Sequence, residues 1–129
     1  MMTSLFVYGT LKRRAPGRPH RLLRSAQFVG SASVRGRLYD LGRYPGLVRE
    51  RANDGRVFGE LYELPDDVAK RALRNLDEYE GQEFDRQRMY AVLPDGRRRA
   101  SWVYVLREQP RDSARPVQSG RYKLKRGAA

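Results

Sequence analysis

The residues best suited to chemistry are three neighbouring carboxylates, Asp77, Glu78 and Glu80, because a carboxylate with a raised pKa can act as a general base. A helix is predicted over residues 66–80, and its apolar residues recur at the three- and four-residue spacing of one buried stripe: Ala69, Ala72, Leu73 and Leu76. At about 100° per residue, Glu80 lies only about 40° around the helix from Leu76, whereas Asp77 lies about 100° away and Glu78 about 160°. Glu80 is therefore the carboxylate that we expect to face the core.

Burial at the edge of an apolar interior should raise the pKa of Glu80 toward the range in which a general base works. Two alternatives stay open from the spacing alone. The last turn of the helix can fray, which would place Glu80 in solvent, or its carboxylate can pair with an arginine such as Arg86.

Other catalytic groups are scarce in this chain. The sequence contains no cysteine, which excludes disulfides, thiolate nucleophiles and cysteine-based zinc sites. Its only histidine, His20, cannot form a metal cluster alone, and no Gly-x-Ser-x-Gly motif supplies a serine nucleophile beside it. We interpret His20 as a surface residue and expect no metal site, so the chemistry falls to carboxylates, hydroxyls and backbone groups.

A second candidate element is the segment that follows the first predicted strand. This apolar strand, 5–8, leads into Gly9, Thr10 and Leu11, where backbone N–H groups can be exposed to a substrate carboxylate or a developing oxyanion. The alternative is that Gly9 is needed only for steric reasons. Tyr8 can add a hydroxyl to the site, or it can be a core aromatic with its hydroxyl at the surface.

The elements that must position these groups form an α+β fold, a small mixed β-barrel with one main helix. Further strands are predicted over the following ranges: 28–41 as one long bent strand, 47–48, 57–64, 86–93 and 99–106. Turn residues at 53–55 and 94–96 indicate hairpins. Gly36 and Gly59 interrupt similar strand segments, and a glycine within a strand marks a bulge, a barrel corner or the close approach of another backbone. We therefore expect two strands of a strongly coiled sheet or small barrel.

The chain of 129 residues is expected to form a single domain, 1–129, in which roughly 110–129 is a partly flexible tail. A short helix is predicted over 20–25. No run of residues approaches the ~18 apolar positions of a membrane span, and the N-terminal segment does not have the pattern of a signal peptide. We therefore expect a cytoplasmic protein that does not insert into membranes.

The net charge of +12, from 27 basic and 15 acidic side chains, raises the question of a nucleic-acid partner. The cations are spread over 13–24, 35–56 and 97–126 rather than held in one stripe. We expect a solvated basic surface that binds nucleic acid weakly and without sequence preference. A small anionic substrate would also be attracted by this charge.

Several segments occur together in an order that is specific to one family and span nearly the whole chain: Phe-Val-Tyr-Gly-Thr-Leu-Lys at 6–12, Gly-Arg-Leu-Tyr-Asp at 36–40 with Tyr-Pro-Gly at 44–46, Val-Phe-Gly-Glu-Leu-Tyr at 57–62, Leu-Asp-Glu-Tyr-Glu-Gly at 76–81, Trp-Val-Tyr at 102–104 and Ser-Gly at 119–120. In this combination the chain resembles the γ-glutamylcyclotransferase-like (AIG2-like) family. The Tyr-Gly-Thr-Leu form is closest to the γ-glutamylamine cyclotransferase branch. The chain departs from the family pattern at Phe84, where tyrosine is frequent, and at Arg121-Tyr122, where an acidic residue and tryptophan are common.

The resemblance implies a compact barrel whose Tyr8–Leu11 loop holds the glutamyl part of a substrate. It also implies that the acidic catalyst is the glutamate before glycine, here Glu80, in agreement with the helical projection. The implied reaction cyclises a γ-glutamyl amine or amino acid to 5-oxoproline and releases the amine, without a metal or organic cofactor.

Two other functions remain open from the sequence. The first is a non-catalytic module that binds a small acidic metabolite in the same cavity. The second, less favoured by the dispersed cations, is a basic barrel that binds nucleic acid through arginines and interleaved aromatics. The leaving group and the oligomeric state are also open.

Overall fold

The computed structural model describes residues 1–9, 11–12, 20–49 and 55–123. Within these ranges the chain forms eight strands, one α-helix and one short 3₁₀ helix: β1 Met2–Val7, η1 Arg21–Leu23, β2 Gln27–Arg35, β3 Arg37–Asp40, β4 Pro45–Val48, β5 Arg56–Pro65, α1 Asp66–Glu80, β6 Phe84–Val92, β7 Arg98–Leu106 and β8 Arg115–Pro116. Among these described residues, no helix combines the length and apolar composition that crossing a bilayer requires.

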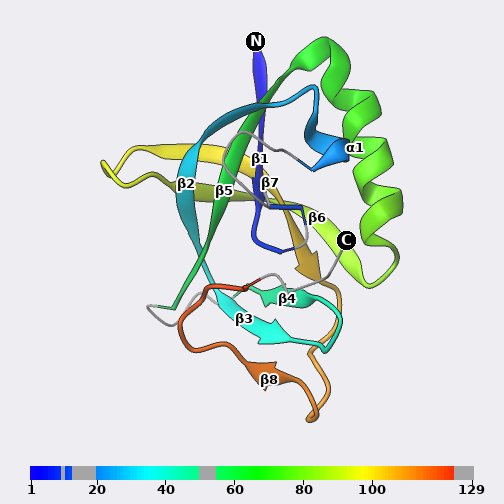
Figure 1. Cartoon of the computed structure of the whole chain (residues 1–129), viewed down its shortest axis with the longest axis vertical. Helices are drawn as coiled ribbons and strands as arrows, with labels where there is room; N and C mark the ends of the chain where they lie inside the picture. The colour runs from blue at the N-terminus through cyan, green and yellow to red at the C-terminus, as the bar shows by residue number, and fades with distance from the viewer. Residues whose placement is uncertain (10, 13–19, 50–54, 124–129) are drawn as a thin grey trace.

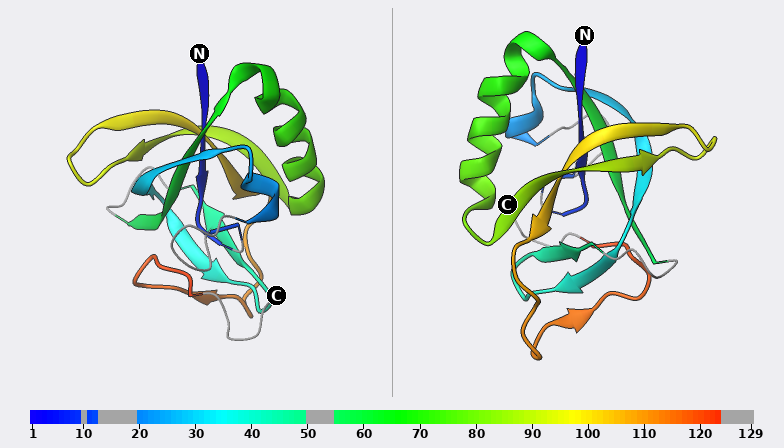
Figure 2. Two further views of the ribbon diagram at one scale, coloured as in Figure 1. Left: turned by 45° about the horizontal axis from the view of Figure 1, so that its top comes forward. Right: turned by 180° about the vertical axis from the view of Figure 1, so that it is seen from behind.

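Five strands close into a barrel in the order β1-β5-β2-β6-β7 (Figure 1). All but one of the pairings between successive barrel strands are antiparallel, and β1 closes the barrel by pairing parallel to β7. A second sheet of β4, β3 and β8 lies beside one end of the barrel, and α1 packs along the side of the barrel (Figure 2). The predicted α+β barrel with one main helix is therefore confirmed.

The C-terminal half of strand β1 is buried on both faces because it lies between two parts of the core. Phe6 and Tyr8 belong to the cluster inside the barrel, whereas Leu5 and Val7 belong to the cluster beneath α1. This alternation follows from the two-residue period of a strand. The strand therefore carries its C-terminal end, and the Gly9 loop after it, to the junction of barrel and helix.

Helix α1 has the predicted bounds and the predicted buried face. Pro65 precedes its first residue, and Asp66 and Asp67 lie in the first turn, where carboxylates interact favourably with the helix dipole. Ala69, Leu73 and Leu76 form its buried stripe, whereas Ala72, also predicted to belong to it, is only partly buried against the same cluster. The helix ends at Gly81, whose positive φ of 80° reverses the chain toward β6.

The prediction of one long bent strand over 28–41 is wrong. The extended segment is interrupted at Gly36, which divides it into β2 in the barrel and β3 in the small sheet. A Cβ atom at Gly36 would lie 2.7 Å from the carbonyl oxygen of Val48, so the residue is constrained by the neighbouring backbone. Sequence periodicity did not indicate this change of sheet because both strands are extended and apolar on alternate positions.

The remaining turn and helix predictions have mixed outcomes. The hairpin between β6 and β7 is confirmed, since the N–H of Leu93 donates to the carbonyl of Arg97 at 2.8 Å. The helix predicted over 20–25 is present only as the 3₁₀ helix η1. Residues 53 and 54 of the other predicted hairpin turn lie outside the described ranges.

In the C-terminal segment, the described residues up to 123 contact the small sheet and the barrel. Strand β8 pairs with β3, and the N–H of Val117 donates to the carbonyl of Leu38 at 2.8 Å. The ring of Tyr122 is buried in the cluster inside the barrel.

Candidate active site

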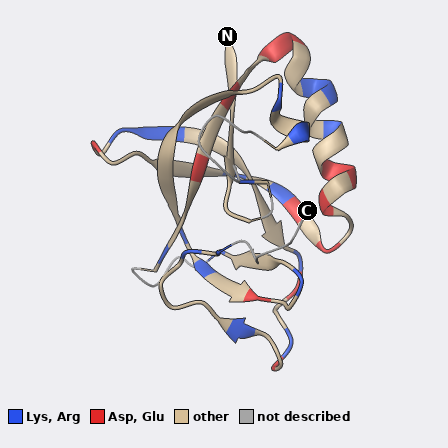
Figure 3. Cartoon of the chain, in the orientation of Figure 1, with Lys and Arg blue, Asp and Glu red and all other residues tan. Residues whose placement is uncertain are grey.

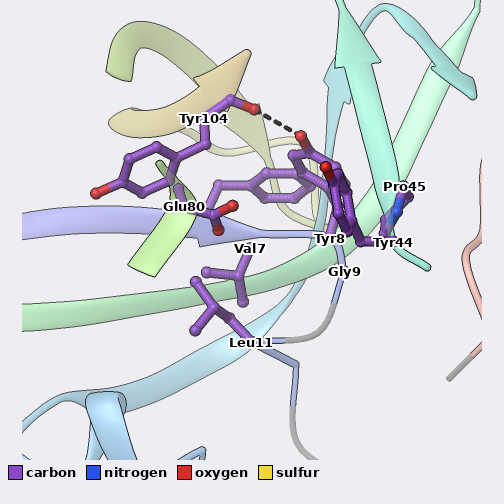
Figure 4. A pocket seen from close by; sticks show the side chains of 9 residues that line it. Val7, Tyr8, Gly9, Leu11, Tyr44, Pro45, Glu80 and Tyr104 are labelled. Carbon is purple, nitrogen blue, oxygen red and sulfur yellow. Dashed lines mark hydrogen bonds between the residues drawn. The ribbon is translucent and has the colours of Figure 1, made fainter. Parts of the chain in front are cut away.

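A small pocket lies where β1, β4, β7 and the last turn of α1 meet (Figure 4). It is lined by residues from each of these elements: Phe6, Val7, Tyr8, Gly9, Leu11, Tyr44, Pro45, Glu80 and Tyr104. Its volume is about 20 Å³, which is room for about one water molecule. A larger ligand can bind here only if the lining side chains move apart.

The structure brings most of the sequence-predicted site residues to this one pocket. Glu80, Tyr8, Gly9 and Leu11 all line it, although Glu80 is 69 positions or more from the other three in the chain. Thr10 lies outside the described residues. The sequence departures at Phe84, Arg121 and Tyr122 do not line the pocket.

Glu80 is half-buried at the end of α1, one turn after the fully buried Leu76, whereas Glu78 is exposed. Burial raises the pKa of the Glu80 carboxyl to about 7. The predicted difference between the two glutamates in their environment is therefore confirmed. A group with this pKa exchanges a proton readily near neutral pH.

The alternative that Glu80 pairs with Arg86 is wrong. The guanidinium of Arg86 instead contacts Asp77, with its Nε 2.9 Å from the carboxylate oxygen Oδ1. In the described part of the chain, no ion pair involves Glu80. Burial therefore acts on its pKa without a compensating cation.

The side chain of Tyr8 is buried, and both hydrogen bonds of its hydroxyl are made within the protein. Its hydroxyl donates to the backbone carbonyl of Tyr104 at 2.7 Å and accepts from the N–H of Leu47 at 3.1 Å. The alternative in which this hydroxyl reaches the surface is therefore wrong, because the residue is only 6% exposed. Burial and the charge of nearby Glu80 raise the pKa of the Tyr8 hydroxyl. Tyr8 thus links the β4 and β7 walls of the pocket.

Replacing Tyr8 with phenylalanine should lower the free energy of unfolding by about 1–3 kcal/mol, because it leaves the Leu47 N–H and the Tyr104 carbonyl without their partner. Urea denaturation measures this change. Tyr90→Phe is the matched control, since Tyr90 is 62% exposed and should tolerate the same loss of a hydroxyl. Equal stabilities of the two variants would contradict the structural role of the Tyr8 hydroxyl.

The structure around Gly9 leaves no room for a side chain at this position. A Cβ atom at this position would lie 2.8 Å from Cγ of Pro45, so the ring of Pro45 occupies the space that a side chain would need. This contact supports the steric alternative for Gly9. The carbonyl of Gly9 accepts from the N–H of Lys12 at 3.1 Å, which closes a tight turn beside the pocket.

Two hydrogen bonds made by residues that line the pocket were not predicted from the sequence. The hydroxyl of Tyr104 donates to Asp77 at 2.7 Å and thereby joins β7 to the turn of α1 that precedes Glu80. The hydroxyl of Tyr44 donates to the Glu83 carboxylate, which raises the pKa of Tyr44. Tyr44 and Tyr104 were two of several tyrosines with no distinguishing spacing, so only the fold could place them at the site.

No metal centre is evident at this pocket or elsewhere in the described ranges, where no three histidine or acidic side chains are grouped to hold an ion. The chemically useful features of the site are a half-buried carboxyl with a pKa of about 7, backbone groups of a tight turn and three tyrosines. This arrangement suits proton transfer within a small pocket.

Comparison with known proteins gives a consistent assignment. A family described as "Gamma-glutamyl cyclotransferase, AIG2-like" matches residues 5–124. A Vibrio cholerae serotype O1 protein named "Putative gamma-glutamylcyclotransferase" is 33% identical over 113 residues, which cover 86% of this chain and 88% of that protein.

Two solved structures share the fold. An AIG2-like protein from Mus musculus matches with a TM-score of 0.63 and 25% identity, over 82% of this chain and 78% of that one. YkqA from Bacillus subtilis matches with a TM-score of 0.72 and 24% identity over 95% of this chain, which spans only 40% of YkqA. The family match, together with the relative from Vibrio cholerae, shows that this chain belongs to the AIG2-like gamma-glutamyl cyclotransferase family.

Proposed function

We propose that this protein cyclises the γ-glutamyl group of a γ-glutamyl amine or amino acid to 5-oxoproline and releases the amine, with Glu80 as general acid and base. The observation that carries the proposal is the state of Glu80, a half-buried carboxyl with a pKa of about 7 in the pocket bordered by Tyr8 and Gly9. Membership of the gamma-glutamyl cyclotransferase family supports the reaction class.

In the proposed reaction, the substrate's α-nitrogen attacks its own γ-carbonyl carbon and closes a five-membered ring. The new bond joins this nitrogen to the γ-carbonyl carbon, and the bond from that carbonyl carbon to the leaving nitrogen breaks. An amine attacks only when it is deprotonated, so Glu80 takes a proton from the α-nitrogen and returns it to the leaving nitrogen. The second proton, which the ring nitrogen loses as the lactam forms, is taken up by Glu80 and passes to the released amine or to solvent. The nucleophile is tethered to the electrophile, so the site mainly has to hold a folded substrate conformation.

Anion recognition is assigned in this proposal to the backbone N–H groups of the loop from Gly9 to Leu11. These N–H groups would hold either the α-carboxylate of the substrate or its γ-carbonyl oxygen, on which negative charge develops during the attack. The net charge of +12 favours the approach of an anionic substrate. The scheme requires no metal or organic cofactor.

The test is a screen of γ-glutamyl amino acids and γ-glutamyl amines for release of 5-oxoproline by the purified protein. Turnover that prefers one class of leaving group would support the proposal and name the substrate class. Binding of these compounds without any turnover would instead support the non-catalytic binding module.

The rate should depend on pH through Glu80. Because the base must be deprotonated, kcat/KM should fall about tenfold per pH unit below an apparent pKa of about 7. The profile should be measured with two substrates that have different leaving groups. Both substrates should show the same fall of kcat/KM at low pH, because this fall reports the titration of the free enzyme. A fall centred near pH 4.5 would exclude Glu80 with its raised pKa as the base.

A further inference from the structure

A second cavity, of about 580 Å³, lies along the β6–β7 hairpin and the adjoining ends of β2, β4 and β5. Among the residues that the structure describes, its charged lining consists entirely of arginines, accompanied by one exposed tyrosine, and we call it the arginine groove: Arg35, Arg49, Arg56, Arg88, Arg98 and Tyr90. None of its described lining residues also lines the Glu80 pocket. The groove is therefore a separate feature that the proposed reaction does not use.

The barrel gathers these charges from distant parts of the chain. Arg35 lies opposite Arg56 across the β2–β5 pair, and Tyr90 lies opposite Ala100 across the β6–β7 pair. Figure 3 shows basic residues along the β6–β7 hairpin and an acidic residue at its tip, with further acidic residues on β5 and at both ends of α1. Cations that are dispersed in the sequence thus converge on one cavity in the fold.

The groove arginines are not neutralised by the described part of the chain. Two arginines of the same hairpin, Arg86 and Arg99, form ion pairs with Asp77 and Glu63. No described acidic residue lines the groove or forms an ion pair with its arginines.

Arg56 is the most constrained of the groove arginines. Its guanidinium donates to the Ser33 side chain and to the Ser33 carbonyl, at 3.0 Å from Nη2 to each oxygen. Burial and the nearby charge of Arg35 lower the pKa of Arg56. A bound anion would relieve this repulsion between like charges.

Tyr90 adds a flat apolar surface to this cationic cavity. Its side chain is 62% exposed, which is unusual for an aromatic residue on a barrel strand. The guanidinium of Arg98 lies 5.1 Å from the centre of its ring. The small Ala100 opposite Tyr90 leaves space beside the ring. An exposed aromatic ring among arginines is the arrangement that stacks a nucleobase while the cations hold phosphate.

We propose that the arginine groove binds a nucleotide, with its phosphate on the arginines and its base stacked on Tyr90, either as a free nucleotide or as part of a single strand. The predicted binding is salt-dependent and tolerant of base sequence, because the described lining offers charge and stacking rather than a set of base-specific acceptors. This keeps the sequence-based expectation of no sequence preference and adds a defined location.

The test is fluorescence anisotropy with a labelled single strand of about ten nucleotides and the full chain, at about 50 mM salt and then at rising salt. Saturable binding is expected. The double variant Arg88→Gln/Arg98→Gln should weaken binding about tenfold or more and reduce the slope of log K against log salt by about 1.4, at about 0.7 per lost phosphate contact. The absence of saturable binding at low salt would overturn the proposal.

The matched control is Arg71→Gln/Arg74→Gln, which removes the same charge from the exposed face of α1. An equal loss of affinity in both double variants would show that only the net charge of the protein matters, and it would overturn the assignment of binding to the arginine groove. Thermal melting of each variant shows that it remains folded.

Two competitors separate the parts of the proposed ligand. Tyr90→Ala should weaken binding of the strand about fivefold or more, yet leave competition by inorganic tripolyphosphate unchanged, because tripolyphosphate has no base. No effect of Tyr90→Ala on the strand would overturn the nucleotide assignment. Competition by ATP at the affinity of the strand would assign the free nucleotide, whereas affinity that rises with strand length would assign the single strand.

Discussion

Replacement of Glu80 by glutamine should reduce 5-oxoproline formation by about a hundredfold or more. The amide keeps the size of the side chain and loses the ability to take up a proton, which is the role proposed for a carboxyl with a pKa of about 7. The pocket around it should keep its shape, since no described ion pair depends on Glu80. Product release by the parent and the variant measures the effect, and circular dichroism confirms the fold.

Glu78→Gln is the control because Glu78 lies on the same turn and is exposed. It should retain the rate of the parent. Full activity in Glu80→Gln would show that the proposed mechanism is wrong, whereas equal losses in both variants would indicate an effect of net charge on substrate capture.

The same variant should also change stability in a pH-dependent way. The folded pKa of Glu80, about 7, is above its ordinary value of 4.5, so the folded state binds this proton more tightly than the unfolded chain. The stabilisation is fully present below pH 4.5 and is lost as the pH rises through about 7. Glu80→Gln should therefore be more stable than the parent at pH 8, by about 3 kcal/mol, and the gain should vanish near pH 4.5.

Gly59→Ala should lower the free energy of unfolding by about 3 kcal/mol or prevent folding. A Cβ atom at Gly59 would lie 2.1 Å from the carbonyl oxygen of Val7 and 2.8 Å from Cζ of Phe6. Strand β5 is paired on both sides, with β1 and β2, so neither neighbour can move away without breaking the barrel. Urea denaturation gives the free energy directly.

Gly30→Ala provides the comparison, since a Cβ atom there would meet only Cδ2 of Leu93 at 3.8 Å, an ordinary contact. Its stability should stay within about 1 kcal/mol of the parent. If both alanine variants were equally stable, the close approach of β1 to β5 would not constrain Gly59.

The features that the sequence by itself determined are those with local causes. The spacing of Leu73 and Leu76 predicted both the helix and the direction of Glu80, because helical periodicity repeats within a few residues. The turn around Gly96 predicted the β6–β7 hairpin for the same reason. The mid-strand position of Gly59 indicated a bulge, a barrel corner or a close backbone approach, and the structure shows that the last of these applies.

Only the tertiary structure decided which distant residues meet. The change of sheet at Gly36, the contact of Tyr104 with Asp77 and the place of the Pro45 ring against Gly9 depend on strand order and register. These are properties of pairs that lie far apart in the chain, and single-residue preferences carry no information about such pairs.

The arginines show the same division most clearly. Their number and the resulting charge of +12 can be counted in the sequence, where Arg35, Arg56 and Arg98 lie in separate segments. Closure of the barrel brings them to one groove, whereas Arg86 and Arg99 on the same hairpin are directed to carboxylates. Arg99 lies on the opposite face of β7 from Arg98, because successive side chains of a strand point to opposite faces. Arg86 shares the face of Arg88, and it is the packing of α1 beside this end of β6 that places Asp77 within reach of it.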